Sequence, residues 1–238
     1  MIKLQRHNIA AISDTRWKAA QNAERKAFDS WKDKAPTTWS RFFSRNFLLT
    51  SEFFCGKSIL EVGCSPVAAL HSIGEARFKV GVDPLTREWR LFYRDGTNHI
   101  QGMGEYLPFK DESFDAALCI NVLDHVQNPS AALKEIQRCL KKGGTLVLWL
   151  QTFSTFRIIR RGLSLIDAPH PHHFSDGEIS LLLQQLGINI NYHRCEKASD
   201  NSAISVMKAG QLISGLKSLF ANWLLGLHES AYICLRTT

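Results

Sequence analysis

The chain has 238 residues, of which 45% are hydrophobic, and its 29 basic and 22 acidic side chains give a formal net charge of +7. This length and hydrophobic content predict a single soluble α/β domain with a large core. No apolar run reaches the roughly 20 residues that a membrane-spanning helix needs. Lys3, Arg6 and His7 interrupt the apolar residues near the N-terminus, so we expect no secretory signal and a cytoplasmic location.

The positive charge is concentrated near the N-terminus. Residues 1–50 contain ten Lys or Arg and four acidic residues, and they also contain Trp17, Trp31 and Trp39. We therefore predict an N-terminal helical arm or lid over residues 1–54. Its helices either pack their apolar sides on the domain, which is the favoured interpretation, or bind nucleic acid through basic and aromatic side chains.

A nucleoside-binding βαβ unit follows this arm. The apolar run Ile59–Val62 predicts a strand that ends at Gly63, where a sharp turn leaves backbone N–H groups exposed. A second apolar run, Val80–Val82, is closed by Asp83, and an acid at this position can accept hydrogen bonds from both ribose hydroxyls. The turn lacks the further glycines of a dinucleotide-binding loop, so a pyrophosphate is not expected.

Three more motifs continue the pattern in chain order. Gly104–Phe109 precedes the acidic segment 111–115, and Asn121–Val126 follows the expected fourth strand. A helical segment at 131–140, the Lys141–Gly144 turn and an apolar strand at 145–150 complete the series. Together the motifs resemble the class I S-adenosylmethionine (SAM) methyltransferases, in their small-molecule, type 11 branch.

The resemblance implies a Rossmann-like, seven-stranded, mostly parallel sheet with helices on both faces, in a domain over residues 55–238. It also implies SAM as the cofactor and S-adenosylhomocysteine as the product. By position, the cofactor-binding residues would be Glu61, Gly63, Cys64, Asp83, Met103, Gly104, Glu105 and Asn121.

The adenine-binding segment differs from the family pattern. Met103 stands where the family usually has an aspartate, which would remove one hydrogen bond worth on the order of 1 kcal/mol. Gly104 can still offer its backbone N–H to the base. Glu105 either compensates by reaching back or is a solvated loop acid.

Four histidines are candidates for contact with the methyl acceptor. His125 lies in the motif after the fourth strand, whereas His170, His172 and His173 precede a helix that a Ser175–Glu178 capping box should begin. Any of them could contact the substrate or act as a general base. The prolines keep the 170–173 segment extended and no acidic ligand is adjacent, so no metal site is expected.

The C-terminal part of the chain is expected to close the sheet. Segments 188–193 and 231–235 predict two strands, and the resemblance implies that they form an antiparallel hairpin at the sheet edge. The apolar pattern between them predicts a helical insertion at 203–228. This insertion is expected to pack on the domain, with a homodimer surface or a substrate lid as alternatives.

The favoured function is SAM-dependent methyl transfer to a small-molecule or glycan-type acceptor, at oxygen. One alternative is an RNA methyltransferase that uses the basic arm, although no RNA-binding module or target-base motif is present. Another is a catalytically silent SAM-fold binding protein, which Ser65, Val67 and Met103 leave open.

Overall fold

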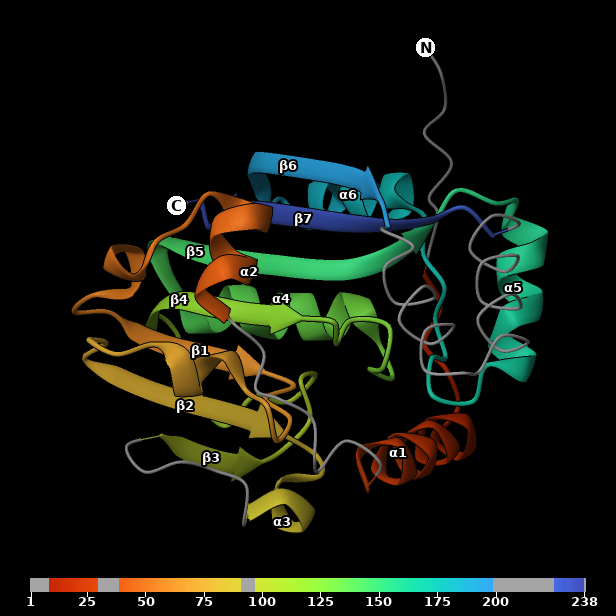
Figure 1. The fold of residues 1–238 in the computed structure, drawn as a ribbon, viewed down its shortest axis with the longest axis horizontal. Coiled ribbons are helices and arrows are strands. Elements are labelled where there is room, and N and C mark those ends of the chain that lie inside the picture. The colour runs from red at the N-terminus through yellow and green to blue at the C-terminus, as the bar shows by residue number, and fades with distance from the viewer. Residues whose placement is uncertain (1–8, 30–38, 91–96, 199–224, 238) are drawn as a thin grey trace, which may run out of the picture.

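The computed structural model describes residues 9–29, 39–90, 97–198 and 225–237, and these form one sheet with helices around it (Figure 1). The seven strands have the order β3-β2-β1-β4-β5-β7-β6. Strand β7 runs antiparallel to both of its neighbours, and the other pairings are parallel, which confirms the expected sheet. The strands are β1 (Ser58–Val62), β2 (Phe78–Asp83), β3 (Asn98–Gln101), β4 (Phe114–Ile120), β5 (Leu140–Phe153), β6 (Asn189–Lys197) and β7 (Leu227–Leu235).

Helices cover both faces of this sheet, as expected. Figure 1 shows α2 in front of the strands and α4 and α6 behind them. Each side has its own buried cluster, one that includes Ile136 and Leu183 and one that includes Phe43 and Phe47. The helical elements are α1 (Asp14–Asp29), α2 (Trp39–Phe47), η1 (Ser51–Phe54), η2 (Ala69–Ser72), α3 (Thr86–Trp89), α4 (Pro129–Cys139), α5 (Arg157–Ile166) and α6 (Asp176–Gln185).

Helix α2, the last helix of the basic N-terminal arm, packs its apolar side into the hydrophobic core. Phe43 and Phe47 are one turn apart and fully buried, whereas Arg41 and Arg45 point to solvent. Burying each phenylalanine contributes about 1.5–3 kcal/mol, which holds the helix against the sheet. The interpretation of amphipathic helices is therefore correct for α2.

The start of α6 confirms the predicted capping box. The Ser175 Oγ accepts a hydrogen bond from the backbone N–H of Glu178, and the Glu178 carboxylate accepts one from the backbone N–H of Ser175 at 2.9 Å. Gly187 follows the helix with a φ of +69°, as a left-handed helix end requires. The capping box fixes the start of α6 and therefore the loop before it, which carries three of the four candidate histidines.

Strands β5, β6 and β7 are longer than the sequence indicated. Strand β5 includes the 141–144 segment that was expected to be a separate turn, with Gly143 at a φ of +71°. Strand β6 continues through Arg194 and Glu196, because an edge strand tolerates charged side chains on its solvent face.

The expected helical insertion at 203–228 lies outside the described residues up to 224. Its last two residues, Leu227 and His228, are not helical and begin β7 instead. The proposed dimer surface on this segment, and Trp31 of the arm, also fall outside the described part of the chain. Among the helices that the structure describes, none combines the length and the apolar character needed to cross a bilayer.

Candidate functional site

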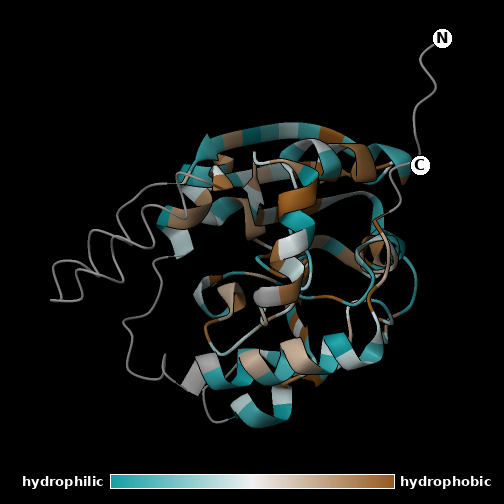
Figure 2. Ribbon diagram, turned by 90° about the vertical axis from the view of Figure 1, so that its right-hand side faces the viewer, coloured by the Kyte–Doolittle hydropathy of each residue, from teal (hydrophilic) through white to brown (hydrophobic). Residues whose placement is uncertain are grey.

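A pocket of about 520 Å³ lies where β1, β2 and β4 end. Figure 2 looks toward this edge of the sheet, where α1 crosses the lower part of the view. Most of the expected cofactor-binding residues line this pocket, but only two of the four candidate histidines do. Those that line it are Glu61, Gly63, Asp83, Met103, Gly104, Glu105, Asn121, His125 and His170.

Glu61 orders the turn after β1 rather than presenting a free carboxylate. Its two oxygens accept hydrogen bonds from the backbone N–H groups of Ala69 and Leu70, each at 3.0 Å. Burial raises the pKa of Glu61 to about 7, against the lowering effect of these two hydrogen bonds. The side chain therefore joins β1 to η2 beneath the pocket.

Gly63 is required at the end of β1 for two reasons. Its φ is +74°, and an added Cβ would lie 2.1 Å from Cγ2 of Val122. Its backbone N–H donates to the carbonyl of Val82 at 2.8 Å, which holds the ends of β1 and β2 together. A side chain here would be strained and would also displace the loop after β4.

Asp83 ends β2 with its carboxylate buried at the pocket. One oxygen accepts from the backbone N–H of Leu85 at 2.8 Å and the other from that of Ser65 at 3.4 Å. Burial raises the pKa of Asp83 to about 7, although both hydrogen bonds favour the ionised form. Each oxygen has a second lone pair that a ligand hydroxyl can use.

The segment after β3 places Met103, Gly104 and Glu105 together along the pocket wall. A Cβ on Gly104 would lie 3.0 Å from Cγ1 of Val62, so the glycine lets the backbone pass close to β1. Glu105 is only 5% exposed, and its Oε1 accepts from the backbone N–H groups of Gln127 and Asn128. The alternative of a solvated loop acid is therefore wrong, because this carboxylate anchors the start of α4.

Cys64 and Asn121 occupy the two sharp turns beside the pocket in different ways. Cys64 is fully buried and does not line the cavity; its Sγ lies 3.4 Å from Nδ1 of His99. Asn121 lines the cavity with a φ of +55°, a region that asparagine tolerates better than most residues. Its backbone N–H donates to the carbonyl of Trp149 at 2.7 Å, which fixes the turn after β4 to β5.

His125 and His170 come from different loops and meet in the pocket lining. Their ring centroids are 4.7 Å apart. The Nδ1 of His125 donates to the carbonyl of Pro169 at 3.1 Å, and Nδ1 of His170 is 3.0 Å from the carboxylate of Asp167. Burial opposes protonation of His170, but neighbouring carboxylates, Asp167 above all, raise its pKa above the ordinary value.

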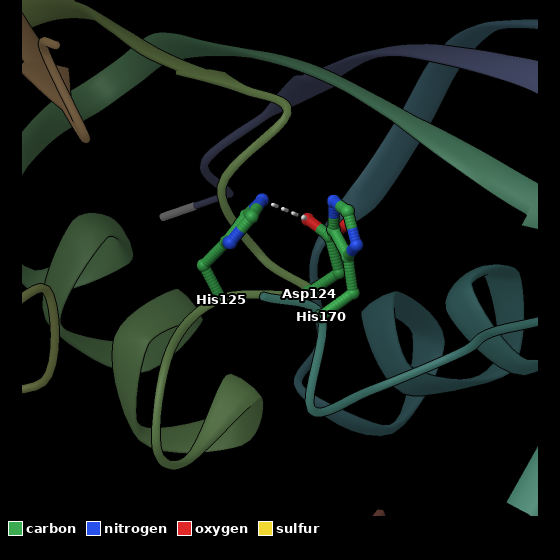
Figure 3. A group of neighbouring side chains, drawn as sticks. All are labelled: Asp124, His125 and His170. Atoms are coloured by element: carbon green, nitrogen blue, oxygen red, sulfur yellow. Dashed lines mark ion pairs between the residues drawn. The ribbon is translucent and has the colours of Figure 1, made fainter. Parts of the chain in front are cut away.

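Asp124 completes this group, and sequence reasoning gave it no role. It is buried beside His125, with its Oδ1 3.8 Å from Nε2 of that ring (Figure 3). The only signal in the sequence was its place next to His125 in the motif after the fourth strand. Its connection to His170 depends on a loop more than forty residues away, which no local pattern contains.

The structure differs from expectation for His172 and His173, which do not line the pocket. Nε2 of His172 donates to the carbonyl of Val126 at 3.0 Å, and burial lowers the pKa of this ring. The side chain of His173 is only 2% exposed, and its Nε2 bonds to Asp167 at 3.0 Å. Both rings hold the loop in place, because in an extended segment neighbouring side chains point in different directions.

Helix α1 closes one side of the pocket with Trp17, Gln21 and Glu24. Arg16 ties this helix to the loop after α5, donating to the carbonyls of Asp167 and Ala168 at 2.7 Å each. Nε of the same guanidinium donates to the carbonyl of Ser164 at 3.3 Å. The helix therefore contacts the same loop that carries His170.

Comparison with known proteins identifies the domain. Residues 60–148 match the type 11 family, described as a methyltransferase domain. An uncharacterised protein, MJ1123, of Methanocaldococcus jannaschii is 37% identical over 82 residues, which are 32% of this chain and 40% of that protein. A tRNA U34 carboxymethyltransferase of Campylobacter hominis is 30% identical over 118 residues, 46% of this chain and 41% of its own.

The chain thus spans less than half the length of these two relatives. Among solved structures, a candidate sarcosine dimethylglycine methyltransferase from Galdieria sulphuraria superposes with a TM-score of 0.71. The match covers 91% of this chain and 98% of that one at 12% identity, so it bears on the fold alone.

The chemistry of the pocket fits SAM, the cofactor of this family. Its charged lining consists of acids, Glu24, Glu61, Asp83 and Glu105, and no lysine or arginine lines it among the described residues. Such a surface attracts a ligand that carries a sulfonium and an ammonium group. Asp83 offers acceptors for the ribose. Residues 60–148 therefore match the type 11 methyltransferase domain, and the chain shares the fold of solved methyltransferase structures.

Proposed function

We propose that this protein transfers the methyl group of SAM to an oxygen atom of an uncharged small molecule, of glycan or aromatic type. The observation that carries the proposal is the composition of the pocket lining, which includes the aromatic rings of Trp39, Phe42 and Trp149 as well as His125 and His170. Bound SAM supplies an activated methyl group on its sulfonium, so the protein has to place the acceptor oxygen in line with it.

The strand order divides the pocket between cofactor and acceptor. Asp83 lies at the end of β2, Gly63 at the end of β1 and Asn121 at the end of β4, and β5 follows next in the sheet. Neighbouring strands are about 4.8 Å apart, so the ends of β2 and β5 are separated by roughly 14 Å. SAM with its ribose at Asp83 and its methionine part near Gly63 leaves the β5 side for the acceptor.

Aromatic rings line the pocket on that side, and one of them has an indole N–H without a hydrogen-bond partner among the described residues. Trp149 of β5 lies edge-on to Phe42 with 5.5 Å between the ring centroids, and Trp39 packs on Phe42 at 5.2 Å. The indole Nε1 of Trp149 is buried and has no hydrogen-bond partner among the described residues. A buried N–H without a partner is costly, and an oxygen atom of the acceptor would satisfy it.

Helix α1 has the role of a lid in this proposal. Trp17 and Glu24 face the pocket, and Glu24 lies 3.7 Å from Nδ1 of His125. His125 lies beside the lid through this contact, and in this proposal His125 and His170 contact the acceptor. His172 and His173 keep the loop in place and take no part in the chemistry.

A nucleic-acid acceptor is the second candidate, since one relative is a tRNA U34 carboxymethyltransferase and the chain carries a net charge of +7. Two features favour the small molecule. The charged residues that line the pocket are acids, which repel phosphates. Arg16 already donates hydrogen bonds to the backbone carbonyls of Asp167 and Ala168. Lys18, Arg25 and Lys26 remain on the solvent side of α1.

The test is a transfer assay with methyl-labelled SAM, in which the full chain is offered a small-molecule extract and total RNA separately. We expect label in the small-molecule fraction. The Asp83→Ala variant should lose both this activity and most of the calorimetric heat of SAM binding. Label in RNA alone, or unchanged SAM affinity in Asp83→Ala, would refute the proposal.

A second variant separates the acceptor from the cofactor. Trp149→Phe keeps an aromatic ring at this position but removes the indole N–H donor. We therefore expect the KM for the acceptor to rise about tenfold while SAM affinity stays the same. An unchanged KM would show that the acceptor does not lie against β5.

A further inference from the structure

We propose that Asp124, His125 and His170 bind a divalent transition-metal ion at the acceptor end of the pocket. Each residue offers one ligand atom, and these atoms lie within 4.8 Å of one another. The three residues form the one group of this kind in the part of the chain that the structure describes. The metal site itself does not depend on methyl transfer, but its role toward an acceptor rests on the function proposed above.

The carboxylate of Asp124 is the first argument for an ion. Its side chain is only 8% exposed, and its Oδ1 is buried without a hydrogen-bond partner among the described residues. The nearest cationic candidate, Nε2 of His125, is 3.8 Å away, too far for a hydrogen bond (Figure 3). A buried carboxylate oxygen left in this state is costly, and a bound cation would satisfy it.

The orientation of the two rings is the second argument. His125 uses Nδ1 toward the carbonyl of Pro169, and His170 uses Nδ1 toward the carboxylate of Asp167. In both rings the proton is then held at Nδ1, which leaves the lone pair of Nε2 available. Metal-binding histidines typically have this arrangement, with the second nitrogen donating to a carbonyl or carboxylate.

The distances fit a metal after a small contraction. Ligand atoms that each lie about 2.1 Å from a zinc ion are separated by roughly 3.4 Å, so atoms up to 4.8 Å apart must approach one another by up to about 1.4 Å. Two imidazoles and one carboxylate suit Zn²⁺, Mn²⁺, Fe²⁺, Co²⁺ or Ni²⁺ better than Ca²⁺ or Mg²⁺, which prefer oxygen ligands. Three protein ligands leave coordination positions open toward the pocket.

An acceptor hydroxyl in an open position would be held and acidified by the metal. Its O–H proton leaves to water, its oxygen forms the new bond to the methyl carbon, and the carbon–sulfur bond of SAM breaks. The products are a methyl ether, S-adenosylhomocysteine and one proton. In this arrangement neither His125 nor His170 has to act as a general base.

The site can be tested without an acceptor. The purified full-length protein is treated with a chelator, dialysed and titrated calorimetrically with Zn²⁺, and Co²⁺ is added separately to record its visible absorption. We expect one ion per chain and a Co²⁺ spectrum with nitrogen and oxygen ligands. Asp124→Asn and His170→Ala should each weaken Zn²⁺ binding at least a hundredfold, with the circular dichroism spectrum confirming that they are folded.

His193→Ala is the matched control. His193 also pairs with a carboxylate, at 2.8 Å from Asp176, but belongs to no group of three, so this variant should bind Zn²⁺ like the parent. Binding of less than one ion per chain, or equal binding in Asp124→Asn, would overturn the metal site. SAM calorimetry with the chelated protein reports the proposed function independently, because SAM should bind with or without the ion.

Discussion

The carboxylate of Asp83 accepts a hydrogen bond from the backbone N–H of Ser65 over 3.4 Å, which joins the end of β2 to the turn after β1. A second bond from Leu85 holds the other oxygen. The acid that we propose as the ribose ligand is thus oriented by the protein's own backbone. Such preorganisation saves the entropy that would otherwise be lost on binding.

We predict that SAM affinity depends on pH through this group. Burial raises the pKa of Asp83 to about 7, and only the ionised carboxylate can accept hydrogen bonds from both ribose hydroxyls. Affinity should therefore be full above this pKa and fall up to about tenfold per pH unit below it. Calorimetry across this range should show the dependence in the parent and not in Asp83→Asn. An equal dependence in both proteins would assign it to another group, such as Glu61.

A matched pair of glycine variants tests the turn after β1. Gly63→Ala combines a φ of +74° with a Cβ 2.1 Å from Val122, whereas Gly143→Ala has nearly the same φ, +71°, and open space around the Cβ. Strain alone costs on the order of 1 kcal/mol at both positions. We expect Gly63→Ala to lower the melting temperature further and to abolish SAM binding, and Gly143→Ala to leave SAM binding intact. Equal effects would show that the contact with Val122 is unimportant.

Much of this architecture could be predicted from short, ordered segments. The strands that end at Gly63 and Asp83 and the capping box at Ser175 depend on local patterns, and the structure confirms them. The antiparallel β6–β7 pair, which the family resemblance implied, is also confirmed. The predicted boundary of β6 was wrong because polar residues at a sheet edge resemble loop residues, and that of β5 was wrong because the 141–144 segment resembles a separate turn.

The site was less predictable because it depends on loops that meet in space. His170 and His173 are three residues apart but differ in environment. His170 lines the pocket, whereas the side chain of His173 is only 2% exposed and packs against Asp167. Asp124 and His170 are separated along the chain by α4, β5 and α5, so only the folded structure brings them together. No acidic residue adjoins the 170–173 segment in the sequence, and the proposed metal ligand Asp124 comes from the other loop, beside His125.

The two histidines should respond differently to substitution. His173→Ala removes a buried ring that bonds to Asp167, so we expect a loss of about 1–3 kcal/mol in the free energy of unfolding with normal SAM affinity. His170→Ala, at a 36% exposed side chain, should cost little stability but reduce turnover about a hundredfold. Denaturant unfolding and acceptor kinetics measure the two effects. Full turnover in His170→Ala would remove the segment from the mechanism.

Arg16 and Lys18 lie on the same helix and allow the lid and RNA interpretations to be separated. Arg16 bonds to two backbone carbonyls of the loop that leads to His170 and to one at the end of α5, whereas Lys18 is exposed to solvent. If α1 is a lid, Arg16→Ala should raise the acceptor KM about tenfold through the lost charge-assisted bonds, and Lys18→Ala should have no effect.

If the basic residues instead bind RNA, the two substitutions should act alike. Each would remove one positive charge, weaken RNA binding and reduce its salt dependence by a similar amount. Filter binding at low and moderate salt, together with acceptor kinetics, measures both outcomes on the same pair of variants. We expect the Arg16 variant to differ from the Lys18 variant in kinetics, because its guanidinium fixes α1 to the loop beside the acceptor and the Lys18 ammonium does not.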